Sequence, residues 1–107
     1  MPSSTNAASR LLQQDGHAIA QGTRLLKAMA NEKRLQILCL LANQELSVTQ
    51  INQQLALSQS ALSQHLAILR NDGLVTTRRE SQTIFYSLTS QSANAILEAL
   101  AQHYAAE

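Results

Sequence analysis

The stretch from Leu57 to Gly73 constrains the fold of this chain most strongly, because it carries the complete pattern of one amphipathic helix. Ser58 suits the position before the first turn, where its hydroxyl accepts a hydrogen bond from an orphan backbone N–H. Gly73 suits the left-handed position just past the last turn. Leucines recur between them at helical spacing and predict a buried stripe of Leu62, Leu66 and Leu69.

The opposite face of this predicted helix is polar but uncharged, whereas an ordinary solvated face more often carries Glu and Lys. Its side chains are Gln59, Ser60, Ser63 and Gln64. Each of them both donates and accepts hydrogen bonds. A Gln amide also pairs bidentately with adenine, and a good pair of that kind discriminates between bases by about 1–3 kcal/mol. The face is therefore predicted to contact base edges and phosphates; the alternative is a merely solvated surface.

Two apolar helices are predicted ahead of this stretch, one over about residues 8–29 and one from Glu32 to about Ala42. The first has weak points at Gly16 and Gly22. A small domain has too little surface of its own to cover so long an apolar stripe, so a partner surface is expected.

A third, short helix is predicted from Ser47 to about Leu55, since Ser47 and Gln50 form a capping-box pattern. Only the few residues around Ala56 separate it from the helix that Ser58 opens. Two helices joined by so short a turn form a helix-turn-helix, whose second helix conventionally enters the major groove of DNA.

After Gly73 the pattern becomes strand-like. Residues 74–78 and 83–88 are rich in β-branched and aromatic types, and the polar residues between them predict a hairpin with a basic tip. A last helix, capped by Ser90 or Ser92, is predicted to run to about Tyr104. The predicted fold is mainly α with a β-hairpin wing: a winged helix-turn-helix in which four helices precede the hairpin and one follows it.

Charge is localised along the chain although the net charge is only +1. From Arg24 to Arg79 there are seven basic and three acidic residues, a net +4, which predicts an anion-binding face. The residues expected to contact the DNA backbone are Arg70, Arg78 and Arg79, with Gln82 and Thr83 assisting at the wing. Ordinary solvation is the alternative for the wing residues. His65 is predicted either to touch phosphate or to pack against the third helix.

The composition favours one soluble domain. Residues 1–7 are predicted to be a flexible tail and residues 8–107 the domain. The polar N-terminus predicts no signal peptide, and no apolar run is long enough to span a bilayer. A single cysteine fits a reducing cytoplasm. No phosphate-cradling glycine loop and no nucleophile beside a base are found, so neither enzymatic activity nor a cofactor is expected.

The residues also resemble a known family. Residues 26–38 (LKAMANEKRLQIL) are similar to the second-helix signature of ArsR-type bacterial repressors, and residues 58–75 and 82–88 resemble that family's recognition helix and wing. Within the family the resemblance is greatest to the HlyU and persulfide-sensing group. It implies a homodimer joined by the first and last helices, two recognition helices in successive major grooves of double-stranded DNA, and an imperfect palindromic operator.

A different class of protein remains as the alternative: a winged-helix protein-interaction module without specific DNA binding, which only the near-neutral net charge encourages. The metal sites of the family are not reproduced. The third-helix site needs clustered thiolates, and residues 45–49 contain no sulfur. The last-helix zinc site needs an Asp-x-His pattern with a second His and a carboxylate, but the end of this helix offers only His103 and Glu107. No metal is therefore expected.

Cys39 matches the position of one of the two reactive cysteines in the HlyU-like group. The second, expected at the end of the last helix, is missing where this chain has Tyr104-Ala105-Ala106. An intramolecular disulfide or polysulfide bridge therefore cannot form. Cys39 is predicted either to be a small buried core thiol, inert because an apolar setting disfavours the thiolate, or to be a one-cysteine oxidation sensor. The surrounding leucines favour the buried thiol.

Overall fold

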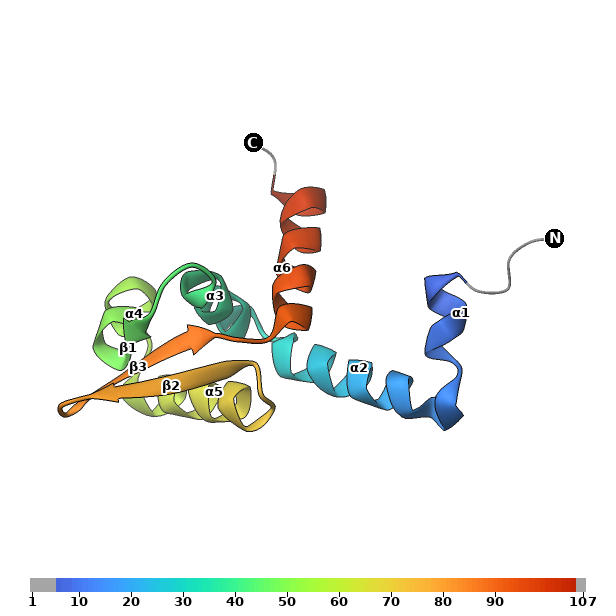
Figure 1. Ribbon diagram of the computed structural model, residues 1–107. Coiled ribbons are helices and arrows are strands. Elements are labelled where there is room, and N and C mark those ends of the chain that lie inside the picture. The colour runs from blue at the N-terminus through green and yellow to red at the C-terminus, as the bar shows by residue number, and fades with distance from the viewer. Residues whose placement is uncertain (1–5, 106–107) are drawn as a thin grey trace.

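The computed structural model describes residues 6–105, and of Gln14 the backbone alone. Most of the predicted tail, and Glu107, lie outside the described residues. In chain order the elements are α1 (Ala7–Leu11), η1 (Gln14–Gly16), α2 (His17–Met29), α3 (Glu32–Leu41), β1 (Leu46–Ser47), α4 (Val48–Leu55), α5 (Gln59–Asn71), β2 (Val75–Glu80), β3 (Thr83–Leu88) and α6 (Gln91–Tyr104) (Figure 1). The predicted winged helix-turn-helix, mainly α with a β-hairpin wing, is confirmed.

The long N-terminal helix predicted over residues 8–29 is broken, and that prediction is wrong. The first piece, α1, is capped by Asn6, which belongs to the predicted tail. The chain then passes through two left-handed residues, Asp15 at φ 56° and Gly16 at φ 80°, before α2 begins. Glycine adopts this conformation readily and Asp tolerates it. Of the two predicted weak points, Gly16 marks the break, while Gly22 lies inside α2.

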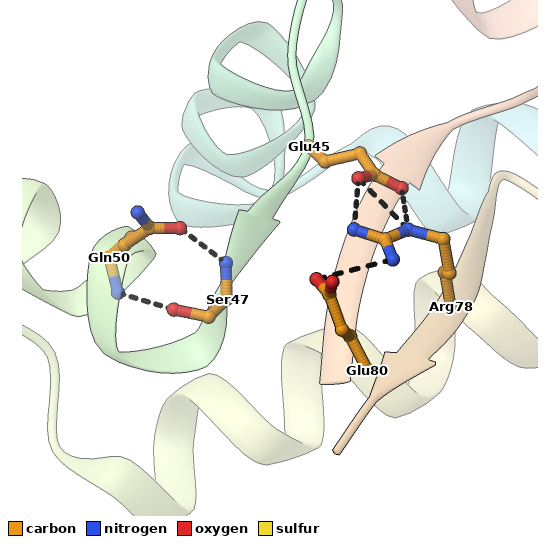
Figure 2. Close-up of polar contacts among 5 residues, drawn as sticks. All are labelled: Glu45, Ser47, Gln50, Arg78 and Glu80. Carbon is orange, nitrogen blue, oxygen red and sulfur yellow. Dashed lines mark hydrogen bonds and ion pairs between the residues drawn. The ribbon is translucent and has the colours of Figure 1, made fainter. Parts of the chain in front are cut away.

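The predicted helix starts are confirmed by their caps. The side chains of Asn31, Ser58 and Ser90 accept backbone hydrogen bonds at 3.0, 3.1 and 3.0 Å from the N–H groups three residues on. At the start of α4 the capping box is reciprocal (Figure 2): Ser47 Oγ accepts from the Gln50 N–H at 3.2 Å, and Gln50 Oε1 accepts from the Ser47 N–H at 2.9 Å.

The end of α5 has the left-handed glycine that the sequence predicts. Gly73 has φ 78°. Its N–H donates to the carbonyl of Arg70 at 3.0 Å, and the next N–H, of Leu74, donates to the carbonyl of Leu69 at 2.8 Å. These two bonds make a Schellman motif, which satisfies carbonyls that the end of a helix leaves unpaired.

The sheet has three antiparallel strands in the order β1-β3-β2. Val75 pairs with Leu88 at the base of the hairpin and Glu80 pairs with Thr83 at its tip, so a two-residue turn closes it. The hairpin is longer than the predicted one because β2 continues to Glu80. The strand β1, which pairs Leu46 with Tyr86, was not predicted, since two residues carry no periodic pattern.

The core lies between α3, α4, α5 and the sheet. Its largest fully buried side chains are Ile37, Leu38, Leu41, Ile51, Leu62, Leu66, Leu69 and Leu74. The N-terminal helices extend away from it (Figure 1). The radius of gyration is 16.2 Å, whereas a compact chain of this length has about 13 Å. None of the helices in the described part of the chain is long and apolar enough to cross a membrane.

Candidate nucleic-acid interface

The two faces of α5 are divided as the sequence predicts. Leu62, Leu66 and Leu69 are buried. The four predicted contact residues on the other face, Gln59, Ser60, Ser63 and Gln64, are all exposed. Since their side chains hydrogen-bond to nothing within residues 6–105, their donors and acceptors are available to another molecule.

The turn between α4 and α5 is held by a residue that the sequence analysis missed. Asn52 Oδ1 accepts a 2.7 Å hydrogen bond from the Leu57 N–H. Between these two residues, Ala56 takes the left-handed conformation with φ 54°. Asn side chains commonly hydrogen-bond to nearby backbone in this way. An Asn near the end of a predicted helix was therefore the sequence feature that could have indicated this bond. The bond fixes the conformation of the turn from which α5 begins.

His65 packs into the protein, which supports one of its two predicted roles. It is half-buried, and its Nδ1 is buried without a hydrogen-bond partner in the described structure. Burial, and secondarily the charge of Arg34 in α3, lowers the pKa of His65. A neutral, inward-facing imidazole is poorly suited to phosphate contact.

Two of the predicted backbone-contacting arginines are exposed and unpaired. Arg70 lies in the last turn of α5 and Arg79 in β2, and neither forms an ion pair within the described residues. Gln82, in the hairpin turn, and Thr83, at the start of β3, are exposed as well. They line a surface hollow together with residues 47–49, so the wing and the N-terminal end of α4 lie on one side of the molecule.

Arg78 is placed differently from the other two. Its guanidinium donates to both carboxylate oxygens of Glu45, with Nε at 3.1 and 3.0 Å and Nη2 at 2.9 Å (Figure 2). Its Nη1 lies 3.5 Å from Glu80. The guanidinium edge that was predicted to contact a DNA phosphate therefore already binds a carboxylate of the protein itself. The signal for this pairing was absent from the sequence, because the partners are 33 residues apart.

Cys39 is exposed, which contradicts the favoured prediction of a buried core thiol. The buried stripe of α3 is formed by Ile37, Leu38 and Leu41, and Cys39 lies off it because successive helical residues turn by about 100°. The thiol lines a shallow hollow between α3 and α6, beside Leu97. In the part of the chain that the structure describes, no three His, Cys, Asp or Glu residues form a group that could hold a metal ion.

Large apolar side chains are also exposed on the terminal helices. They are Leu11, Leu12, Ile19, Leu26, Leu100 and Tyr104. They belong to α1, the residues just after it, α2 and α6, the helices that the core covers least. Exposed apolar side chains that gather into a patch are typical of a protein–protein interface.

A helix with a free polar face, a preceding helix joined to it by a tight turn, and a hairpin wing beside the start of that preceding helix define a winged helix-turn-helix protein. Residues 31–77 match the model of the family described as bacterial regulatory protein, arsR family. The chain is 60% identical over 85 residues to the transcriptional activator HlyU of Vibrio cholerae, covering 79% of each chain. It is 42% identical over 85 residues to the HTH-type transcriptional regulator YgaV of Escherichia coli, covering 78% of this chain and 86% of that one.

Solved structures agree with these matches. Reduced HlyU from Vibrio cholerae superposes with a TM-score of 0.81 at 55% identity, covering 88% of this chain and 99% of that one. NolR from Sinorhizobium fredii has a TM-score of 0.81 at 45% identity, covering 89% and 95%. The chain therefore belongs to the ArsR family of bacterial regulatory proteins, and the resemblance to HlyU seen in its sequence is confirmed.

Proposed function

We propose that this protein regulates transcription by binding an operator, with α5 in the major groove and the wing on the flanking backbone. The observation that carries the proposal is the exposed face of α5, four uncharged side chains with no hydrogen-bond partner inside the described protein. The names of its relatives support it, since they include a transcriptional activator, an HTH-type transcriptional regulator and a repressor. Such a regulator has no need of enzymatic activity and acts in the cytoplasm.

The contacts divide by chemistry. Gln59, Ser60, Ser63 and Gln64 face base edges and nearby phosphates. Arg70 and Arg79 contact the backbone and release counterions, contributing affinity for any sequence. Gln82 and Thr83 add neutral backbone contacts at the wing. We assign His65 to packing rather than to DNA, because of its half-buried position.

A homodimer completes this function. The exposed apolar side chains of α2 and α6 and the extended shape of the chain support a second copy packed on the terminal helices. A two-fold dimer presents two copies of α5 about one DNA turn apart, so the operator is expected to be an imperfect palindrome. The test is sedimentation: Leu26→Glu, which puts a charge on that surface, should convert dimer to monomer, and Ile68→Gln, an exposed apolar site on α5, should not.

Binding to the protein's own upstream region tests the proposal most directly. The wild type should prefer this duplex to a scrambled one of equal length in fluorescence anisotropy. Gln59→Ala with Gln64→Ala should remove most of that preference, whereas Gln36→Ala, at an exposed position of α3, should leave it intact. Equal affinity of the wild type for every genomic and scrambled duplex would contradict the proposal and favour the protein-interaction module.

We also propose that oxidation of Cys39 modulates binding. Its exposure supports this role over inert packing, because a reactive thiol must be reached by the oxidant. With one cysteine in the chain, the first product available is a sulfenic acid rather than an internal disulfide.

A further inference from the structure

The side chain of Arg78 crosses the outer face of the sheet. Arg78 in β2 pairs with Phe85 in β3, and Phe85 pairs with Ser47 in β1. The guanidinium passes over the Phe85 ring, 4.9 Å from its centroid, and ends at Glu45, the residue just before β1. Figure 2 shows the guanidinium between the carboxylates of Glu45 and Glu80. One cation is thereby shared by two anions.

This arrangement holds the guanidinium more firmly than most exposed ion pairs are held. An isolated surface pair contributes little, but bidentate geometry and a network of charges are the conditions under which such pairs persist. Here Glu45 accepts hydrogen bonds on both oxygens, and the guanidinium stacks over the ring of Phe85. The hydrogen bonds from Arg78 lower the pKa of Glu45, which favours the charged form of the carboxylate.

A carboxylate and a phosphate compete for the same feature of arginine. Both accept two parallel N–H bonds from the planar fork, so an arginine held bidentately by Glu45 has its phosphate-binding edge already filled. The next residue, Arg79, is exposed and pairs with no acid in the described structure. Side chains alternate along a strand, which places these neighbouring arginines on opposite faces of the hairpin.

We propose that Glu45 limits the affinity of this protein for DNA by holding Arg78 away from the phosphates. Arg78 is then a latent phosphate ligand. Of the two neighbouring arginines in the wing, only Arg79 is free to bind DNA in each protomer. The inference rests on the proposed function, since it concerns the strength of the same DNA contact. Non-specific affinity is electrostatic, so each additional phosphate contact steepens the slope of log K against log salt by about 0.9.

The test removes the charge of Glu45 while keeping its shape. Glu45→Gln should bind both the upstream and the scrambled duplex more tightly than wild type, by about fivefold or more at about 0.1 M salt, and the salt slope should steepen by about 0.9 per protomer. Glu45→Ala is a second variant that should act in the same direction. Asp15→Asn is the matched control, because it also removes one negative charge and Asn tolerates the positive φ of that position.

The gain must depend on Arg78. Arg78→Gln should cost the wild type little affinity, and in the Glu45→Gln background it should abolish the whole gain. Unchanged or weaker DNA binding by both Glu45 variants, or a gain that persists without Arg78, would overturn the inference.

Elution from heparin separates this inference from the proposed function. Glu45→Gln should elute at a higher salt concentration than wild type and Asp15→Asn, whether or not the protein prefers an operator. If the wild type shows no preference for any duplex, the proposed function fails, while a later elution that requires Arg78 still supports the release of that arginine. If elution is unchanged, the inference fails by itself.

Discussion

The guanidinium of Arg34 in α3 donates a 2.7 Å hydrogen bond from Nε to the carbonyl oxygen of Ala28, in the last turn of α2. Its Nη2 lies 3.5 Å from the carbonyl oxygen of Lys27. The end of a helix leaves its last carbonyls unpaired and carries a partial negative charge, so a cation is well placed there. Arg34 thus joins the helix of the proposed dimer surface to the helix at the centre of the core.

Removing this contact should destabilise the protein. Arg34→Ala is expected to lower the free energy of unfolding by about 1.5–3 kcal/mol, the range for a hydrogen bond made by a charged group. Arg34→Lys should retain only part of this stabilisation, since an ammonium group cannot reproduce the planar fork of the guanidinium. Urea denaturation measures this, with Gln36→Ala as the exposed control on the same helix. Equal midpoints for the three variants would contradict the assigned role.

His65 should make the stability fall in mild acid. Burial and the nearby Arg34 lower its pKa in the folded protein below the ordinary value of 6.5, so the unfolded chain binds the proton more readily. The contribution is fully present above about pH 6.5 and is lost as the pH falls toward the folded pKa. The midpoint of urea unfolding should therefore drop less between pH 7 and pH 5 for His65→Gln than for wild type. The exposed His103, changed to Gln, is the control; a parallel drop in all three proteins would exclude His65.

Replacing Gly73 should destabilise the protein, although there is space for a side chain. Apart from Gly73 itself and its two chain neighbours, no heavy atom lies within 4 Å of a Cβ built there, so the cost of substitution comes from φ 78° alone. Gly73→Ala should cost about 1–2 kcal/mol, and Gly73→Asn less. Gly22 is the matched control: beyond its chain neighbours and the backbone of its own helix, a Cβ built there also meets no atom within 4 Å, but it lies inside α2, where Ala should stabilise by about 0.5–1 kcal/mol. The midpoint temperature of thermal unfolding should therefore fall for Gly73→Ala and rise for Gly22→Ala.

Oxidation should weaken operator binding through Cys39. Treatment with peroxide or persulfide is expected to reduce the affinity of the wild type and to leave Cys39→Ser unchanged, because the serine hydroxyl is not oxidised under these conditions. The measurement is anisotropy of the same operator duplex before and after treatment and after reduction. Identical responses of the two proteins would exclude Cys39 as the oxidation sensor.

The features that the sequence predicted correctly are those whose interactions span few residues. Ser58 caps α5 through an N–H three residues away, and the Ser47–Gln50 box closes over the same distance. The buried stripe of α5 follows from the period of the helix, and Gly73 from the positive φ that its end requires. Local chemistry of this kind is present in the chain before it folds. It determined the helix-turn-helix and the polar face of α5.

The tertiary structure decided which charges and thiols are free. Arg78 and Arg79 are neighbours of the same type, and only the pairing of β1, β3 and β2 brings Glu45 to one of them from 33 residues away. Likewise, the packing of α3 against the core determines that Cys39 faces outward, although leucines surround it in the sequence. The break before α2 combines a glycine with an Asp at positive φ. The presence of an Asp in the sequence does not predict that conformation. These outcomes depend on which segments meet in space, so no periodicity or cap in the chain encodes them.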